Sequence, residues 1–149
     1  MIELPFVKLR HMFSLELPRY DLSPLQLGMG IDPWRVAVCS MLLCRSRRMQ
    51  AQPVLQVLLN FWPSAPHLAR ANESEVEAVV RPCGLQRNRA RQLIRFSSLY
   101  LADTWQDMRE LPGVGAYVAD AVGLFCLGCT ELDSSDGVLR KYAESLCAR

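Results

Sequence analysis

The chain contains no apolar run that approaches the roughly 18 residues of a membrane-spanning candidate, although half of its 149 residues are hydrophobic. This length and apolar content suit one globular domain with a sizeable core. The first 13 residues, MIELPFVKLRHMF, include Glu3 and lack both the apolar segment and the cleavage site of a secretory signal. We therefore expect an intracellular protein that binds no membrane.

Metal-binding patterns are also scarce. The six cysteines include a single CxxC pair, Cys126 and Cys129, with no second pair and no histidine near it. A structural zinc site needs four nitrogen or sulfur ligands, which this pair alone does not supply. Most of the cysteines lie in apolar helical contexts, where a free thiol behaves as a small hydrophobe. We expect buried free thiols, no metal and no cofactor.

The chain also lacks the alternation of apolar and polar residues that marks a half-buried strand. Apolar residues recur instead at helical spacing, and capping residues such as Asp32 and Asn72 precede them. We predict an all-α protein of about eight to ten short helices. The expected helices cover residues 33–44, 49–61, 64–71, 72–80, 87–102, 107–111, 116–127 and 136–147. In the helix over 87–102, the residues expected to face the core are Ala90, Leu93, Ile94, Ser97 and Leu101.

The beginning of the chain differs from the rest, because Pro5, Pro18 and Pro24 interrupt any long helix there. We expect residues 1–30 to form an extended or short-helical arm that packs onto the domain. Residues 31–149 then form the helical domain itself, with a hairpin at residues 108–127.

The formal net charge is only +2, but the charges are unevenly distributed. No acid lies within residues 33–72 or 78–102, and both tracts carry several arginines. Such tracts suit a face that binds a polyanion. Helical spacing places Arg87, Arg91 and Arg95 on one stripe, which favours a basic patch over an ordinary solvated helix face.

A glycine-rich turn precedes the helix predicted over 116–127. In Leu111-Pro112-Gly113-Val114-Gly115, the two glycines permit a positive φ and leave space for a ligand to approach the backbone. A turn that opens a helix presents free N–H groups at the positive end of the helix dipole, where a phosphate can bind. The alternative is a simple stop between two packed helices.

Five stretches together resemble a known family. They are DPWRVAV (residues 32–38), LLCRSRR (42–48), PCGLQRNRARQL (82–93), LPGVGAYVAD (111–120) and DGVLRKY (136–142). The pattern, which runs from Ser23 to the C-terminus, resembles the helix-hairpin-helix DNA glycosylases. Within them it is most similar to the mismatch-specific thymine and uracil glycosylases, in particular the catalytic domain of those that carry a methyl-CpG-binding domain. The resemblance implies the all-α fold of that superfamily. It implies no iron–sulfur cluster, because only Cys147 follows Asp136.

The resemblance also assigns the catalytic residues. Asp136 corresponds to the family's catalytic carboxylate, which stabilises positive charge at the sugar as the base departs. Asp136 is equally a plausible helix cap, and Asp133 is a rival acid. Tyr117 occupies the position at which strand-cleaving relatives carry a lysine, so the resemblance implies base removal without strand cleavage. A half-buried core tyrosine is the alternative for Tyr117.

Contacts to DNA follow from the same comparison. Arg45 and Leu85 match the side chains that fill the gap left by a flipped nucleotide, although a surface cation and a capping contact are the ordinary explanations. Gln26 matches a glutamine that contacts the base. The residues expected to hold the DNA backbone are Gly113, Val114, Gly115, Arg140 and Lys141.

The sequence thus predicts a monofunctional glycosylase of base excision repair that removes thymine or uracil mispaired with guanine. Its partner is double-stranded DNA with a mismatched or damaged base, and we expect a monomer that associates with DNA inside the cell. An adenine glycosylase and a catalytically silent DNA-binding module are the alternatives. A helical protein-interaction domain is a third, and it would show no salt-dependent affinity for DNA.

Overall fold

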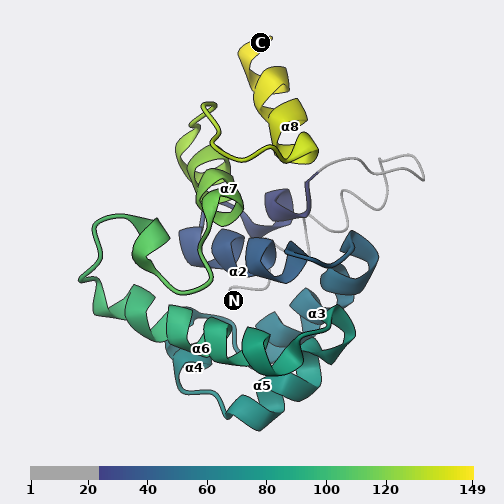
Figure 1. Ribbon diagram of the computed structural model, residues 1–149, viewed down its shortest axis with the longest axis vertical. Coiled ribbons are helices and arrows are strands. Elements are labelled where there is room, and N and C mark those ends of the chain that lie inside the picture. Colours follow the sequence, from purple (N-terminus) through teal and green to yellow (C-terminus); the bar gives the residue numbers. More distant parts are fainter. Residues whose placement is uncertain (1–23) are drawn as a thin grey trace.

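The computed structural model describes residues 24–149, and these residues form helices and loops with no strand (Figure 1). The all-α prediction is therefore confirmed. The short 3₁₀ helices are η1 (Leu25–Met29), η2 (Arg81–Cys83) and η3 (Met108–Glu110). The α-helices are α2 (Pro33–Leu43), α3 (Arg48–Phe61), α4 (Ala65–Ala69), α5 (Glu73–Val80), α6 (Gln86–Ala102), α7 (Ala116–Leu127) and α8 (Gly137–Cys147). Most of the arm expected over residues 1–30 lies outside the described residues.

Helix α2 occupies the centre of the structure, with α7 and α8 on one side and α3 to α6 on the other (Figure 1). Its start is defined by Asp32, whose carboxylate accepts hydrogen bonds from the N–H groups of Trp34 at 3.0 Å and Arg35 at 3.4 Å. Pro33 at the first position suits this start, because its fixed φ matches the helix. Nine of the eleven residues of α2 are buried, so this helix forms the middle of the core.

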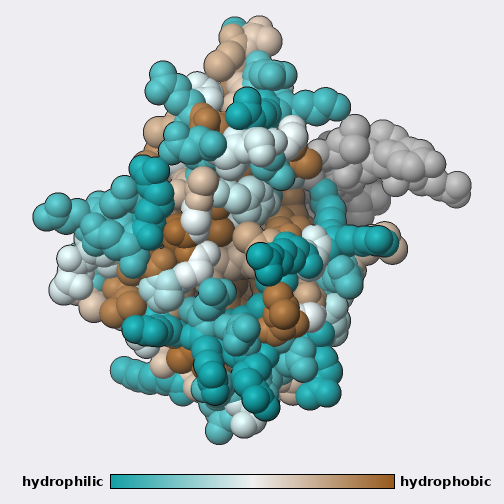
Figure 2. Space-filling view, viewed as in Figure 1, coloured by the Kyte–Doolittle hydropathy of each residue, from teal (hydrophilic) through white to brown (hydrophobic). Residues whose placement is uncertain are grey.

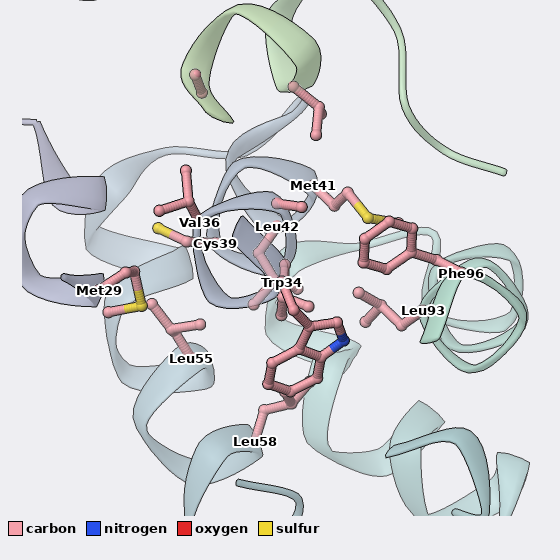
Figure 3. Packing of buried hydrophobic residues seen from close by; sticks show 14 of the residues in the cluster. Met29, Trp34, Val36, Cys39, Met41, Leu42, Leu55, Leu58, Leu93 and Phe96 are labelled. Atoms are coloured by element: carbon pink, nitrogen blue, oxygen red, sulfur yellow. The ribbon is translucent and has the colours of Figure 1, made fainter. Parts of the chain in front are cut away.

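The core joins side chains of α2 to those of α3 and α6 (Figure 3). Trp34 is buried in this core, and its indole Nε1–H donates to Ser97 Oγ at 3.0 Å. Ser97 in turn donates to the carbonyl of Leu93 at 2.8 Å, within α6. A buried indole N–H needs an acceptor, and Ser97 supplies it, which ties α2 to α6 by a specific polar contact.

Helix α6 departs from two of the expectations. Leu101 is 46% exposed rather than buried in the core, since it lies in the last turn of the helix. The arginine stripe faces α5: Arg91 Nε lies 2.8 Å from a carboxylate oxygen of Glu73, and Arg87 Nε lies 4.0 Å from one of Glu77. These acids neutralise two of the three arginines, so the stripe is not the free basic patch that the sequence favoured.

The cysteines are less uniformly buried than expected. Cys39 and Cys83 are buried, but Cys129 and Cys147 are exposed. Among residues 24–149, no cluster of three or more histidine, cysteine, aspartate or glutamate side chains is placed to hold a metal ion. None of the helices described is both long and apolar enough to span a bilayer.

The contact between Trp34 and Ser97 gives a stability prediction. Ser97→Ala should lower the free energy of unfolding by about 1–3 kcal/mol, because the buried indole N–H is left without an acceptor. Ser98→Ala, at the exposed neighbouring position of the same helix, should change it by less than about 0.5 kcal/mol. Urea unfolding followed by tryptophan fluorescence measures both. Equal effects of the two substitutions would contradict the role of this hydrogen bond.

Candidate active site

A cavity of about 710 Å³ lies where four segments of the chain meet, and its volume is in the range of small-molecule sites. Its lining comes from η1, from the end of α2 with the turn after it, from α7, and from the loop that leads into α8. It brings together Gln26, Arg45, Tyr117 and Asp136, which the sequence analysis singled out from four separate stretches. On the face that Figure 2 shows, apolar residues gather over the middle of the molecule, surrounded by hydrophilic ones.

Asp136 is the half-buried acid of this cavity. It is the N-cap of α8, where its Oδ2 accepts a hydrogen bond from the N–H of Leu139 at 2.9 Å. Its Oδ1 has no hydrogen-bond partner among the residues that the structure describes. The sequence allowed this residue to be both a helix cap and the catalytic acid, and its two carboxylate oxygens make the two roles compatible. One oxygen fixes the side chain, and the other is left to act on a ligand.

The rival acid, Asp133, does not line this cavity. Its side chain is exposed and lies 3.1 Å from Arg109 Nη1 in an ion pair. Its backbone N–H, like that of Ser134, donates to the carboxylate of Asp120, at 3.2 and 2.6 Å respectively. The geometry thus places Asp136, not Asp133, beside the cavity.

Asp120 is a functional candidate that the sequence analysis missed. It is a buried acid on α7, and its two hydrogen bonds fix the loop that carries Ser134 and Asp136. A signal was present in the sequence, because Asp120 is the only charged residue of an otherwise apolar helix, AYVADAVGLFCL. A charge in such a position needs buried partners, and here they are two backbone N–H groups.

Tyr117 and Gln26 form a hydrogen-bonded pair at the wall of the cavity. The amide Nε2 of Gln26 donates to the phenol oxygen of Tyr117 at 2.8 Å and to Ser40 Oγ at 3.3 Å. Because the phenol oxygen accepts in this bond, its own hydrogen remains available to a ligand. Burial raises the pKa of Tyr117 well above its usual value, and the nearby charge of Asp136 raises it further. The phenol is therefore neutral at physiological pH and cannot act as a base.

Cys44 contributes a thiol to the lining of the cavity. Burial raises the pKa of Cys44 above its ordinary value, so little of the reactive thiolate is present at neutral pH. No lysine lines the cavity among the residues described. In the described part of the chain the site offers a carboxylate, a neutral phenol and a primary amide, and no lysine amine that could form a Schiff base.

Arg45 and Leu85 share an unusual backbone conformation. Both have a positive φ, 57° for Arg45 and 50° for Leu85, in the left-handed region that side chains other than glycine rarely adopt. Leu85 is 54% exposed on the turn before α6, and Arg45 is exposed on the turn after α2. Strained turns of this kind cluster at ligand-binding sites. Arg45 lines the cavity, whereas Leu85 does not.

The glycine-rich turn between η3 and α7 forms the predicted hairpin. Gly113 has a φ of 79°, which only glycine adopts without strain. Gly113 and Gly115 have backbone N–H groups with no acceptor in residues 24–149. The N–H of Val114 instead donates to the carbonyl of Leu111 at 3.2 Å, and its side chain is buried. The N–H of Val114 is thus already used within the turn, and contact of Gly113, Val114 and Gly115 with the DNA backbone stays a prediction.

Arg140 and Lys141 lie in the first half of α8, outside the cavity. Arg140 donates from Nε and Nη2 to the carbonyl of Ser134, at 3.2 and 3.0 Å. It therefore holds the carbonyl of Ser134, whose N–H is held by Asp120. Lys141 is exposed and has no ion-pair partner among the described residues. Contact with DNA remains a prediction for both residues.

The chain matches no protein-family model, but individual proteins are similar to it. A methyl-CpG-binding domain protein 4-like protein of Arabidopsis thaliana is 35% identical over 133 residues, which cover 89% of this chain and 30% of that protein. A thymine-DNA glycosylase of Aeropyrum pernix is 34% identical over 107 residues, which cover 67% of this chain and 48% of the relative. The chain thus spans less than half the length of either.

The fold gives an independent comparison. The structure of a thermostable thymine-DNA glycosylase superposes on 87% of this chain and 60% of its own, with a TM-score of 0.65 at 19% identity. The chain belongs to the helix-hairpin-helix DNA glycosylase superfamily, as its sequence motifs indicated. Within that superfamily, its relatives in sequence include proteins named as thymine-DNA glycosylases.

The hairpin offers a matched pair of substitutions. A Cβ on Gly113 would lie 2.6 Å from Met41 Cε and 3.3 Å from Gln92 Oε1, whereas one on Gly115 would meet nothing within 4 Å. Gly113→Ala should therefore destabilise the protein by about 1–3 kcal/mol through backbone strain and crowding. Gly115→Ala should leave the free energy of unfolding nearly unchanged. Thermal unfolding of both variants decides this, and a stable Gly113→Ala protein would show that the hairpin is packed differently.

Proposed function

We propose that the chain is a monofunctional DNA glycosylase that removes thymine or uracil mispaired with guanine, acting as a monomer on double-stranded DNA inside the cell. The observation that carries the proposal is the Asp136 carboxylate, held by one oxygen and open to the cavity with the other. The neutral Tyr117 phenol and the Gln26 amide beside it supply hydrogen-bonding groups for a flipped pyrimidine. The names of the relatives support the same substrate class.

The reaction breaks the bond between the base nitrogen and C1′ of the deoxyribose. The bonding electrons leave with the base, so positive charge develops on the sugar. The Asp136 carboxylate stabilises this charge by its own negative charge and accepts a proton from the attacking water. The water oxygen bonds to C1′, and the proton ends on the released base. The products are the free base and an abasic site in an uncut strand.

Tyr117 explains why the strand stays intact. Strand cleavage by β-elimination requires an amine that attacks C1′ and forms a Schiff base, and a phenol cannot do so. Its hydroxyl hydrogen instead donates to the flipped nucleotide, while Gln26 fixes the ring. The amide of Gln26 is only 1% exposed, so it is preorganised rather than free to reorient.

Arg45 and Leu85 act before the chemical step. Extrusion of a nucleotide costs a few kcal/mol of stacking and pairing, least at a mismatch. Side chains that enter the vacated space oppose the return of the base. Arg45 at the rim of the cavity and Leu85 on the neighbouring turn are the two side chains that we assign to this space.

The substrate test is single-turnover cleavage of labelled duplexes with T·G, U·G or A·8-oxoguanine, each read with and without alkali. We expect base loss from T·G or U·G that becomes a strand break only after alkali, and no complex trapped by borohydride. Breaks without alkali would overturn the monofunctional assignment. Base loss only from A·8-oxoguanine would favour an adenine glycosylase, and none from any duplex would favour a silent DNA-binding module.

The catalytic assignment has a matched control in the rival acid. Asp136→Asn removes the charge but keeps a good helix-capping residue, so duplex binding and folding should persist while base release falls by at least 10²-fold. Asp133→Asn, which removes an exposed ion pair, should release base at nearly the wild-type rate. Single-turnover rates and gel-shift affinities of both variants measure this. Wild-type turnover by Asp136→Asn would exclude it as the catalytic carboxylate.

A further inference from the structure

A single buried arginine connects the two strained turns. Arg89 lies on the inner face of α6 and is 8% exposed. Its Nη1 donates to the carbonyl of Met41 at 2.8 Å, and its Nη2 to that of Cys44, at the end of α2. Its Nε donates to the carbonyl of Gly84 at 2.9 Å, and Nη2 also lies 3.4 Å from that of Cys83.

Two of these carbonyls belong to the peptide groups that directly precede Arg45 and Leu85. The carbonyl of Cys44 belongs to the same planar peptide group as the N–H of Arg45, and that of Gly84 to the same group as the N–H of Leu85. The orientation of each peptide plane sets the φ angle of the residue that follows. Arg89 therefore acts directly on the two peptide groups that precede Arg45 and Leu85.

Arginine is required for this arrangement by its geometry. The planar guanidinium has five N–H donors in a rigid fork, whereas a lysine has one nitrogen at the end of a flexible chain. Carbonyls on both turns, which are about 40 residues apart in sequence, meet one rigid group. No carboxylate is paired with Arg89 in the described part of the chain, so its charge is stabilised by carbonyl oxygens alone.

We propose that Arg89 is a positioning residue that holds the Arg45 and Leu85 turns in fixed register, so that both side chains enter the DNA together. This rests on the proposed function, in which these two side chains occupy the space of the flipped nucleotide. Arg89 itself touches neither the cavity nor the reacting atoms. Its removal uncouples the two turns and leaves the Asp136, Tyr117 and Gln26 site in place.

Hydrogen exchange tests the structural part without DNA. In Arg89→Met, amides of residues 41–48 and of residues 82–88 should both exchange faster, while those of α7 remain as slow as in the wild type. Arg95→Met, an exposed arginine of the same helix, should change neither segment. Faster exchange in residues 82–88 alone, or equally throughout the protein, would overturn the proposal. If Arg89→Met does not fold, the exchange rates of the same two segments are compared between Arg89→Lys and the wild type.

A double-mutant cycle tests the functional part, with 2-aminopurine next to the mismatch as a reporter of base flipping. Leu85→Ala should reduce the fluorescence change in the wild-type background and add little in the Arg89→Met background, because the turn is already misplaced. Base release should fall on the order of 10²-fold in Arg89→Met, with the salt dependence of duplex binding retained. Independent, multiplicative effects would show that Arg89 only stabilises the fold.

The two experiments separate the failure of this proposal from that of the proposed function. A wild-type protein that releases no base from any duplex would refute the glycosylase assignment, yet the exchange data would still decide whether Arg89 joins the turns. Normal base release with unchanged exchange in residues 41–48 of the Arg89 variants would refute the positioning role alone.

Discussion

The carboxyl end of α2 is partly buried: Met41 and Leu42 lie in the core, and Leu43 and Cys44 are half-buried. The last carbonyl groups of a helix have no partner within it and need donors from elsewhere. This constraint shapes the site. Arg89 supplies donors from α6, and in doing so brings the turn after α2 next to the turn before α6. A requirement of the core, satisfaction of backbone carbonyls, thus determines which turn lies beside the turn that carries Arg45.

Two acids also accept hydrogen bonds from the backbone in and beside the site. Asp120 accepts from the N–H of Ser134 at 2.6 Å, and Asp136 accepts from the N–H of Leu139 at 2.9 Å. They differ in whether a carboxylate oxygen is left without a hydrogen bond. Asp120 uses both oxygens on the loop, so its charge is committed to structure. Asp136 uses one oxygen, so a charge remains at the cavity. Fixing a carboxylate by a helix cap lets it keep its orientation as charge develops on a substrate, with little reorganisation.

The sequence predicted the fold class and most helix positions, because caps such as Asp32 and the apolar spacing act locally. It also selected Gln26, Tyr117 and Asp136, which the fold brings to one cavity. The sequence did not predict the surroundings of a side chain where these depend on a partner far away in the chain. The spacing of the arginines of α6 favoured a basic patch, yet two of them pair with acids of α5, and Arg89 is buried. Spacing offered a clue, since Arg89 precedes the buried Leu93 by four residues and so shares its face.

The strain at Arg45 and Leu85 also has a physical rationale. A left-handed residue other than glycine costs on the order of 1–3 kcal/mol, so two of them on adjacent turns need compensation. Glycine at either position would remove the strain but also the side chain that projects from the turn. The fold keeps the side chains and holds the peptide groups before them by hydrogen bonds to a cation, which are stronger than those between neutral groups. Such an arrangement favours a rigid projection over a relaxed turn, as the role proposed above for Arg45 and Leu85 requires.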